Sequence, residues 1–75
     1  MDFDFSKLLG RIVEKFGTRK AFFEVAGIPE SALSYRLSNK SRFTMDEIYR
    51  IIQPDCLDID PAEISLYFFT QKFDK

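Results

Sequence analysis

The sequence predicts an all-α fold, a compact bundle of five short helices. Two observations support this: apolar residues recur at helical spacing in each segment, and residues that commonly cap or end helices stand between the segments. A third is the scarcity of the alternating pattern of a strand, for which only FFTQKF, residues 68–73, is a candidate. No linker divides the chain, so we expect one domain over residues 1–75.

Composition excludes several classes of protein. The chain has one cysteine, Cys56, and no histidine, so an internal disulfide is excluded and neither zinc nor imidazole chemistry is expected. No apolar run approaches the roughly 20 residues of a membrane span, and the beginning, MDFDFSK, is acidic rather than a basic secretion signal. We therefore expect a small soluble domain in a reducing cytoplasm, whose nine Phe and three Tyr supply large side chains for its core.

The first expected helix covers residues 5–16. Asp4 or Ser6 is placed to cap its start, and Gly17 is placed to end it in a left-handed turn. Six apolar residues at i, i+3, i+4, i+7, i+8 and i+11 form one stripe that we expect to face the core: Phe5, Leu8, Leu9, Ile12, Val13 and Phe16.

A second helix, RKAFFEVA, is expected over residues 19–26. Thr18 precedes it as an N-cap, and Gly27 follows it as a stop. Ile28 is the apolar residue of the connection to a third helix. Pro29 fits the first turn of that helix, where a missing N–H costs nothing.

The third helix is expected to run to about Ser38. Leu33 and Leu37 are placed to face inward. Asn39 is the expected end, because Asn tolerates the left-handed conformation better than other residues with a side chain. The positions expected to face outward are Ser31, Ser34, Tyr35 and Ser38.

Two further helices begin with capping signals. TMDE, residues 44–47, is a capping box, and Pro54 ends the helix that it opens. The inward residues expected there are Met45, Ile48, Ile51 and Ile52. In DPAE, residues 60–63, Asp60 caps a fifth helix and Pro61 takes its first position. An aromatic tail, residues 67–75, is expected to close the core and in part to form an association surface, with Tyr67, Phe68, Phe69 and Phe73.

The charges are segregated along the chain. Between residues 11 and 42 there are seven basic and three acidic residues, whereas the flanks hold four basic and nine acidic ones. A basic centre with acidic flanks is typical of a phosphate-binding face on a body that repels DNA elsewhere. The acidic cluster lacks the ligand spacing and central glycine of a calcium loop, so we expect no metal site at Asp55, Asp58, Asp60 and Glu63.

Residues 18–40 have the pattern of a helix-turn-helix. A capped helix, a tight turn with Gly27 and Ile28, and a second helix of similar length follow one another, and the apolar positions agree with this arrangement. In this motif the second helix can enter the major groove of DNA. The sequence has no histidine-based nucleophile pair and no Gly-rich phosphate loop, so we do not expect an enzyme.

The stretch FGTRKAFFEVAGIPESALSYRLSNKSRFTMDEI resembles the helix-turn-helix of phage repressors of the Cro and lambda-repressor type. With DFSKLLGRIVEKFG before it and IDPAEISLYFFTQKF after it, the resemblance extends to small bacteriophage proteins described as Cro-like, and it covers nearly the whole chain. It implies a lambda-repressor-like bundle of five helices, a third helix in the major groove, and dimers on operator half-sites, in the cytoplasm of a bacterial host.

The resemblance also implies which residues contact DNA. Arg19 matches a phosphate contact at the start of the second helix, with Lys20 beside it. The positions that match base-facing residues are Glu30, Ser31, Ser34 and Tyr35. The remaining expected contacts lie at the end of the third helix and in the loop beyond it, at Ser38, Asn39, Lys40 and Arg42.

Two departures from the family's pattern matter. This chain has Phe23 where the family usually has Ala, and Ala26 where the family usually has a large aliphatic residue. Such an exchange of sizes is tolerated in cores, and we favour Phe23 in the core over Phe23 exposed beside the reading face. The second departure is Glu30, which can accept a hydrogen bond from cytosine N4 but whose charge repels phosphate.

Two functions stay open. The first is a Cro-like transcriptional regulator that binds double-stranded operator DNA through the third helix. The second is an antirepressor, similar to phage modulators of repression, that binds the cognate phage repressor and blocks its DNA binding. Lys40 and Arg42 favour the first, whereas Glu30, Phe23 and Tyr35 favour the second. Neither function needs a cofactor, a membrane or a small-molecule substrate, and both are compatible with a homodimer.

Overall fold

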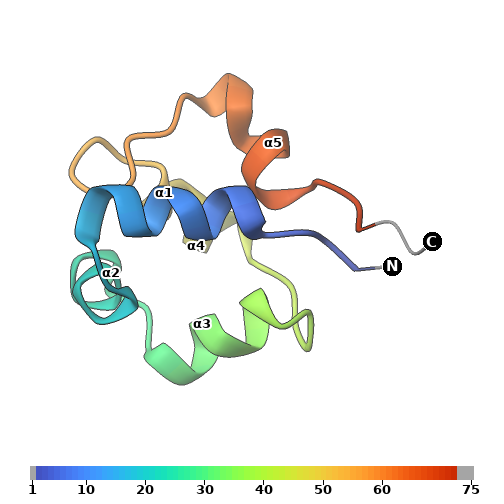
Figure 1. Cartoon of the computed structure of the whole chain (residues 1–75), viewed down its shortest axis with the longest axis horizontal. Helices are drawn as coiled ribbons and strands as arrows, with labels where there is room; N and C mark the ends of the chain where they lie inside the picture. The colour runs from blue at the N-terminus through green and yellow to red at the C-terminus, as the bar shows by residue number, and fades with distance from the viewer. Residues whose placement is uncertain (1, 73–75) are drawn as a thin grey trace.

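Five α-helices and one short 3-10 helix (η1) make up the fold, in a computed structural model that describes residues 2–72 (Figure 1). The elements are α1 (Ser6–Phe16), α2 (Arg19–Ala26), α3 (Glu30–Leu37), α4 (Met45–Ile51), η1 (Pro61–Glu63) and α5 (Ile64–Phe68). No strand occurs within these residues, so the all-α prediction is confirmed. The radius of gyration is 11.7 Å, close to the roughly 11 Å of a compact chain of this length. Over the same residues, no helix has the length and apolar character needed to span a membrane.

The predicted capping residues set most of the helix boundaries. The side chain of Thr18 accepts a hydrogen bond from the Ala21 N–H at 3.2 Å, and α2 ends at Gly27 with a φ of +69°. Asn39 has a φ of +65°, as expected of the residue that ends the third helix. The Asp60 side chain accepts from the Ala62 N–H at 2.9 Å. These local signals were read correctly, because a cap and its partner lie within three residues of each other.

Three boundaries differ in detail from the prediction. Phe5 is the N-cap residue of α1 and provides no side-chain cap, whereas Asp4 accepts hydrogen bonds from the N–H and the hydroxyl of Ser6, the first residue of the helix. Pro29 precedes α3 as its N-cap residue, one position before the first helical turn. The fifth helix starts as η1, because Pro61 opens a 3-10 turn before α5 begins.

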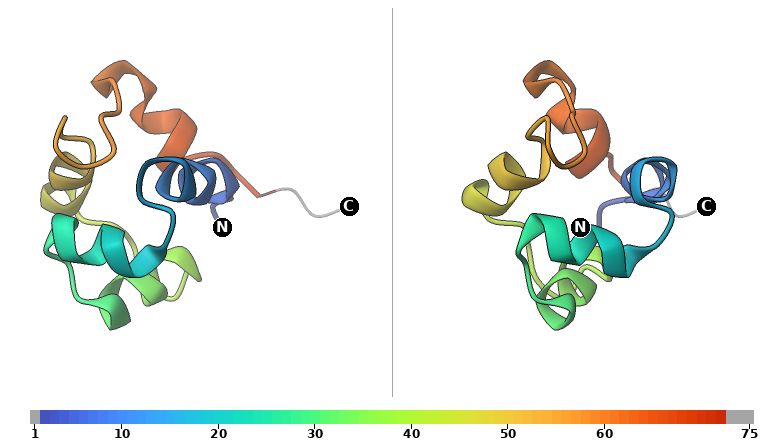
Figure 2. Two further views of the ribbon diagram at one scale, coloured as in Figure 1. Left: turned by 60° about the vertical axis from the view of Figure 1, so that its left-hand side comes forward. Right: turned by 90° about the vertical axis from the view of Figure 1, so that its left-hand side faces the viewer.

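The core lies between α1 and the other helices. α1 packs against both α2 and α5, and α2 packs against α3. Both views of Figure 2 place α2 and α3 toward one end of the molecule and η1 with α5 toward the other. Fully buried side chains from every α-helix and from the loop after α4 meet in this core, among them Leu8, Ile12, Phe22, Leu33, Ile51, Leu57 and Phe68.

Phe23 belongs to this core, as we favoured, because it is 9% exposed and Ala26 beside it is fully buried. Two other expectations were wrong. Val13 is 61% exposed, since at about 100° per residue it lies some 80° around α1 from Phe5, at the margin of the apolar stripe. Met45 is 67% exposed, because it is the first residue of α4 and precedes the turn that carries Ile48 into the core.

The two ends of the described chain run side by side in a short antiparallel pair, which we call the terminal ribbon and define as residues 2–4 and 70–72. The Asp4 N–H donates to the Thr70 carbonyl at 2.8 Å, and the Lys72 N–H donates to the Asp2 carbonyl at 3.0 Å. Phe3 and Gln71 face each other as an isolated bridge. The strand considered for residues 68–73 is thus reduced to this one bridge, and Phe73 lies outside the described residues.

Candidate nucleic-acid interface

The turn between α2 and α3 joins the two helices that carry most of the predicted contacts. The Gly27 N–H donates to the Phe23 carbonyl at 2.9 Å, and the left-handed conformation of Gly27 turns the chain away from α2. Ile28 is 7% exposed and anchors the turn in the core. Pro29 then adopts an extended conformation that directs the chain into α3. A glycine and a buried aliphatic residue thus fix how α3 leaves α2.

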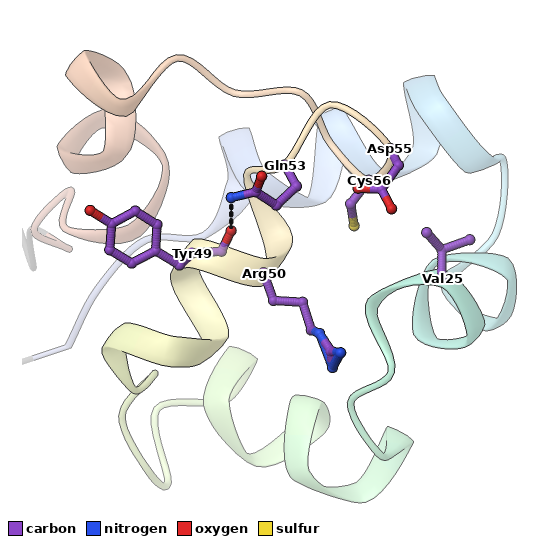
Figure 3. Close-up of a pocket in the computed structure, with 6 residues that line it drawn as sticks. All are labelled: Val25, Tyr49, Arg50, Gln53, Asp55 and Cys56. Atoms are coloured by element: carbon purple, nitrogen blue, oxygen red, sulfur yellow. Dashed lines mark hydrogen bonds between the residues drawn. The ribbon is translucent and has the colours of Figure 1, made fainter.

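Arg50 on α4 covers the outside of this turn. A Cβ on Gly27 would lie 3.0 Å from the Arg50 Nη1 atom, at the end of a side chain that can shift, so it is the positive φ of Gly27 that favours glycine there. Arg50 also borders a cavity of about 360 Å³ between α2, α4 and the loop at residues 55–56, with Val25 at its edge (Figure 3). Cys56 lies at this cavity with 3% of its surface exposed, and burial raises the pKa of its thiol.

The outer side of α3 carries short polar side chains. All five residues expected to face DNA from this helix and its end are exposed: Glu30, Ser31, Ser34, Tyr35 and Ser38. Leu33, on the opposite side, is 1% exposed. The helix therefore has one apolar side in the core and one side of hydroxyls with a single large ring, Tyr35, that is 55% exposed.

Exposed cations precede and follow this surface along the chain. Arg19 and Lys20 are exposed in the first turn of α2. Lys40 is exposed in the loop after α3, and its Nζ lies 5.6 Å from the centroid of the Tyr35 ring. This cation–π contact places a positive charge beside the largest exposed side chain of α3.

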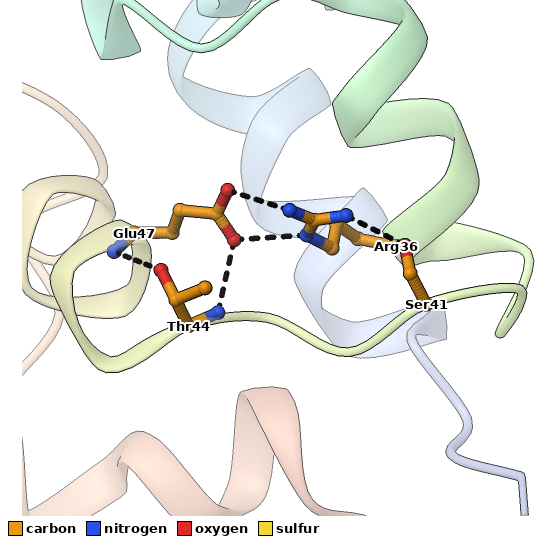
Figure 4. A network of polar contacts seen from close by, with 4 residues as sticks. All are labelled: Arg36, Ser41, Thr44 and Glu47. Atoms are coloured by element: carbon orange, nitrogen blue, oxygen red, sulfur yellow. Dashed lines mark hydrogen bonds and ion pairs between the residues drawn. The ribbon is translucent and has the colours of Figure 1, made fainter.

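Arg36 is turned away from this surface and holds α3 to α4. Its Nε donates to Glu47 Oε1 at 2.9 Å and its Nη2 to Glu47 Oε2 at 3.1 Å (Figure 4). Its Nη1 donates to the Ser41 hydroxyl at 2.6 Å. Glu47 and Thr44 also form the predicted capping box of α4. We call these four residues the Arg36 network.

The two charges of this network stabilise each other. The hydrogen bond from Arg36 holds the pKa of the Glu47 carboxyl below its usual value, aided by the Thr44 backbone N–H, and the same pair raises the pKa of Arg36. Both side chains are less than one-fifth exposed. An ion pair with two parallel hydrogen bonds and little solvent is strong and well oriented.

Arg11 is likewise engaged inside the molecule. Its Nε donates to the Leu57 carbonyl at 3.0 Å, its Nη2 donates to the Asp58 carbonyl at 3.2 Å, and its Nη1 pairs with Glu14. The basic centre predicted from the sequence therefore loses Arg11 and Arg36 to structural contacts. Its other five members are exposed: Lys15, Arg19, Lys20, Lys40 and Arg42.

Asn39 was expected to meet the DNA backbone, but its carboxamide is bound within the chain. Its Oδ1 accepts from the Phe3 N–H at 2.9 Å, and its Nδ2 donates to the Phe3 carbonyl at 3.0 Å. Arg42 donates to the same Oδ1 at 3.0 Å and lies over the Phe3 ring, 5.1 Å from its centroid. Phe3 and Glu47 thus organise the surroundings of α3, and no local sequence signal singles them out for this role.

Comparison with protein families gives a match, which covers the whole of this surface. A family model described as "Protein of unknown function (DUF739)" matches residues 1–71. All six helical elements and every residue of the candidate interface lie within the matched range. No curated protein matches the sequence.

Proposed function

Because the chain belongs to the DUF739 family, whose description names no activity, we propose its function from the surface of α2 and α3. We propose that it is a Cro-like transcriptional regulator that binds double-stranded operator DNA in the bacterial cytoplasm. In this proposal α2, the turn at Gly27 and α3 form a helix-turn-helix, and α3 enters the major groove.

The observation that carries the proposal is the composition of the exposed side of α3. Ser31, Ser34 and Ser38 keep this side low and polar, so that the helix backbone can approach a groove closely. Their hydroxyls can donate to or accept from base edges and phosphates. A surface built to bind another protein through apolar burial would carry more large side chains than the one ring of Tyr35.

The flanking cations support the same proposal. Arg19 and Lys20 at the first turn of α2, and Lys40 with Arg42 beyond α3, lie on either side of the serine-rich surface along the chain. Contacts of this kind to phosphates position a reading helix without specifying sequence. Glu30 opposes them, and Arg36 is held by Glu47, so we expect modest affinity that weakens as the salt concentration rises.

One observation favours the second candidate, an antirepressor that binds the cognate phage repressor. Tyr35 is 55% exposed and Val25 on α2 is 45% exposed. An exposed aromatic residue is a common anchor for a protein partner. Glu30 suits such a partner if the surface that it covers is the basic, DNA-reading face of a repressor.

The two candidates predict opposite rankings of variants. The experiment measures affinity for duplex DNA from the phage regulatory region and for purified repressor across a salt series. For a DNA-binding protein, Lys40→Ala weakens binding to every sequence and lowers the salt slope by about one unit. Ser31→Ala and Tyr35→Ala relax discrimination by about 1–3 kcal/mol at one base pair. For an antirepressor, Tyr35→Ala costs most and salt has little effect.

Lys7→Ala is the charge-matched control. Lys7 is exposed on α1, and its Nζ lies over the Tyr67 ring of α5 at 5.1 Å, so it belongs to neither α2 nor α3. Its loss should leave the salt slope unchanged. A wild-type chain that shows no salt-dependent DNA binding at low ionic strength, but binds repressor tightly, would contradict the first proposal and support the second.

A further inference from the structure

We propose that Asn39 is a positioning residue, which ties the terminal ribbon to the end of α3 and fixes Arg42 at the edge of the candidate interface. The tie itself is a property of the folded chain. Its effect on DNA affinity rests on the proposed function. The inference replaces the expectation that the Asn39 side chain contacts the DNA backbone.

The hydrogen bonds of the ribbon leave the backbone of Phe3 directed outward. Asp4 and Asp2 make the two bonds to the opposite segment, so Phe3 and Gln71 form a pair without bonds between them. In such an antiparallel pair, the N–H and the carbonyl of the residue at the pair point away from the partner strand. These are the two Phe3 groups that the Asn39 carboxamide binds, at 2.9 and 3.0 Å. The carboxamide thus takes the place of a neighbouring strand.

Two properties of asparagine are used together at this position. The backbone φ of +65° follows the end of α3, and asparagine adopts that conformation more readily than most residues. The carboxamide supplies one acceptor and one donor on the same planar group. Glycine would satisfy the backbone but supply neither group, and aspartate would supply the acceptor without the donor.

Arg42 is linked to this arrangement twice. It donates to Asn39 Oδ1 at 3.0 Å, so that this oxygen accepts from both Phe3 and Arg42. Its guanidinium also lies over the Phe3 ring, which in turn makes an edge-to-face contact with the Phe69 ring, with centroids 5.7 Å apart. The position of Arg42 therefore depends on a ring that Asn39 holds in place through the backbone.

The tie can be tested without nucleic acid by amide hydrogen exchange of the full chain. In Asn39→Gly, which keeps the left-handed backbone accessible, the Phe3 amide should exchange at least about tenfold faster, because its acceptor is lost. The core amide of Ile12 serves as an internal reference and should change far less. Unchanged exchange of the Phe3 amide would overturn the proposal, because Asn39 would then not protect it. Equal acceleration at Phe3 and Ile12 would also overturn it, because Asn39 would then stabilise the whole fold rather than tie the ribbon.

Phe3→Ala separates the backbone tie from the ring contact. It removes the ring beneath Arg42 but keeps the N–H and carbonyl that Asn39 binds. Exchange at residue 3 should stay slow, while the Arg42 Nε–H should become more mobile by nitrogen relaxation. If Arg42 is as ordered in Phe3→Ala and in Asn39→Gly as in the wild type, the proposed positioning is wrong.

The effect on the interface is measured by a double-mutant cycle of Asn39→Gly and Arg42→Ala, with a duplex of the phage regulatory region as probe. In the wild-type background, Asn39→Gly should weaken DNA binding by about three- to tenfold. In the Arg42→Ala background it should have little further effect. Independent, additive losses would overturn the proposal, because Asn39 would then contact DNA directly. A wild-type chain that binds no duplex contradicts the proposed function alone, and hydrogen exchange then decides the tie.

Discussion

Arg36, in the last turn of α3, and Arg42, in the loop beyond it, stand six residues apart and have different surroundings. Arg36 lies on the inner side, where Glu47 and Ser41 accept hydrogen bonds from all three of its nitrogens. Arg42 lies on the outer side, exposed, over the ring of Phe3. In the sequence the two arginines contribute equally to one basic segment.

This difference shows why a charge count overstates a binding surface. A guanidinium that is held by a carboxylate adds to stability and orientation, and it has little left to offer a phosphate. The Arg42 guanidinium donates to Asn39 and lies over the Phe3 ring, but it is exposed, so these contacts add less to stability and its solvent side stays accessible to a partner. Substitutions on the inner side of α3 should therefore change the free energy of unfolding, and substitutions on the outer side should leave it nearly unchanged.

The largest expected contrast is between the neighbouring residues Leu33 and Ser34. Leu33 is 1% exposed, so Leu33→Ala should destabilise the protein by about 2–5 kcal/mol through lost burial and the cavity left behind. Ser34 is exposed, and Ser34→Ala should stay within about 0.5 kcal/mol of the wild type. Urea denaturation measures both. Similar losses in the two variants would mean that α3 is not seated in the core by its Leu33 side.

The second contrast concerns Glu47, the partner of Arg36. Glu47→Ala should cost about 1.5–3 kcal/mol, because a little-exposed arginine loses a charge-assisted acceptor and α4 loses half of its capping box. Arg42→Ala, its counterpart on the outer side, should cost much less. Equal losses in the free energy of unfolding for Glu47→Ala and Arg42→Ala would show that the inner and outer sides of α3 do not differ in this way.

The same pair predicts a dependence on pH. The folded protein lowers the pKa of Glu47 from the ordinary value of 4.5, chiefly through the hydrogen bond from Arg36. This stabilisation is fully present above pH 4.5 and is lost as the pH falls through the lowered pKa of the folded state. Glu47→Gln cannot titrate there, so its stability should fall less steeply with acid than that of the wild type. If the free energies of unfolding of the two proteins fell in parallel below pH 4.5, the lowered pKa of Glu47 would be contradicted.

The smallest expected difference in stability is between two variants of Thr44, which is the N-cap residue of α4 and a member of the Arg36 network. Thr44→Ala removes the oxygen that accepts from the Glu47 N–H at 3.1 Å, and it should cost about 0.5–2 kcal/mol. Thr44→Ser keeps a hydroxyl and should recover most of that loss. Thermal denaturation of the pair provides the measurement, and no difference between Ala and Ser would show that the capping hydroxyl contributes nothing.

Much of the fold could be predicted because its signals are local. Thr18, Gly27 and Asn39 each act on backbone within a few residues, and the structure places each in the predicted role. Val13 and Met45 were misplaced because periodicity gives the direction of a side chain around a helix but not how far the neighbouring elements reach over it.

The candidate site was predictable only on its outer side. The exposed positions of α3 follow from the helical period once Leu33 is assigned to the core. The partners of Arg11 and Asn39 lie 46 and 36 residues away along the chain, and that of Arg36 lies across a helix boundary. No spacing rule connects such pairs, so the sequence could not show that these polar side chains were already engaged.

The terminal ribbon also bears on how the chain folds. Pairing residues 2–4 with residues 70–72 closes a loop of nearly the full described chain, whereas the contacts of α2 with α3 join near neighbours. Closing a loop of that length costs entropy that a few backbone bonds cannot offset until the helices between them have packed. We therefore expect the ribbon to form after the folding transition state, so that weakening it would speed unfolding and leave the folding rate nearly unchanged.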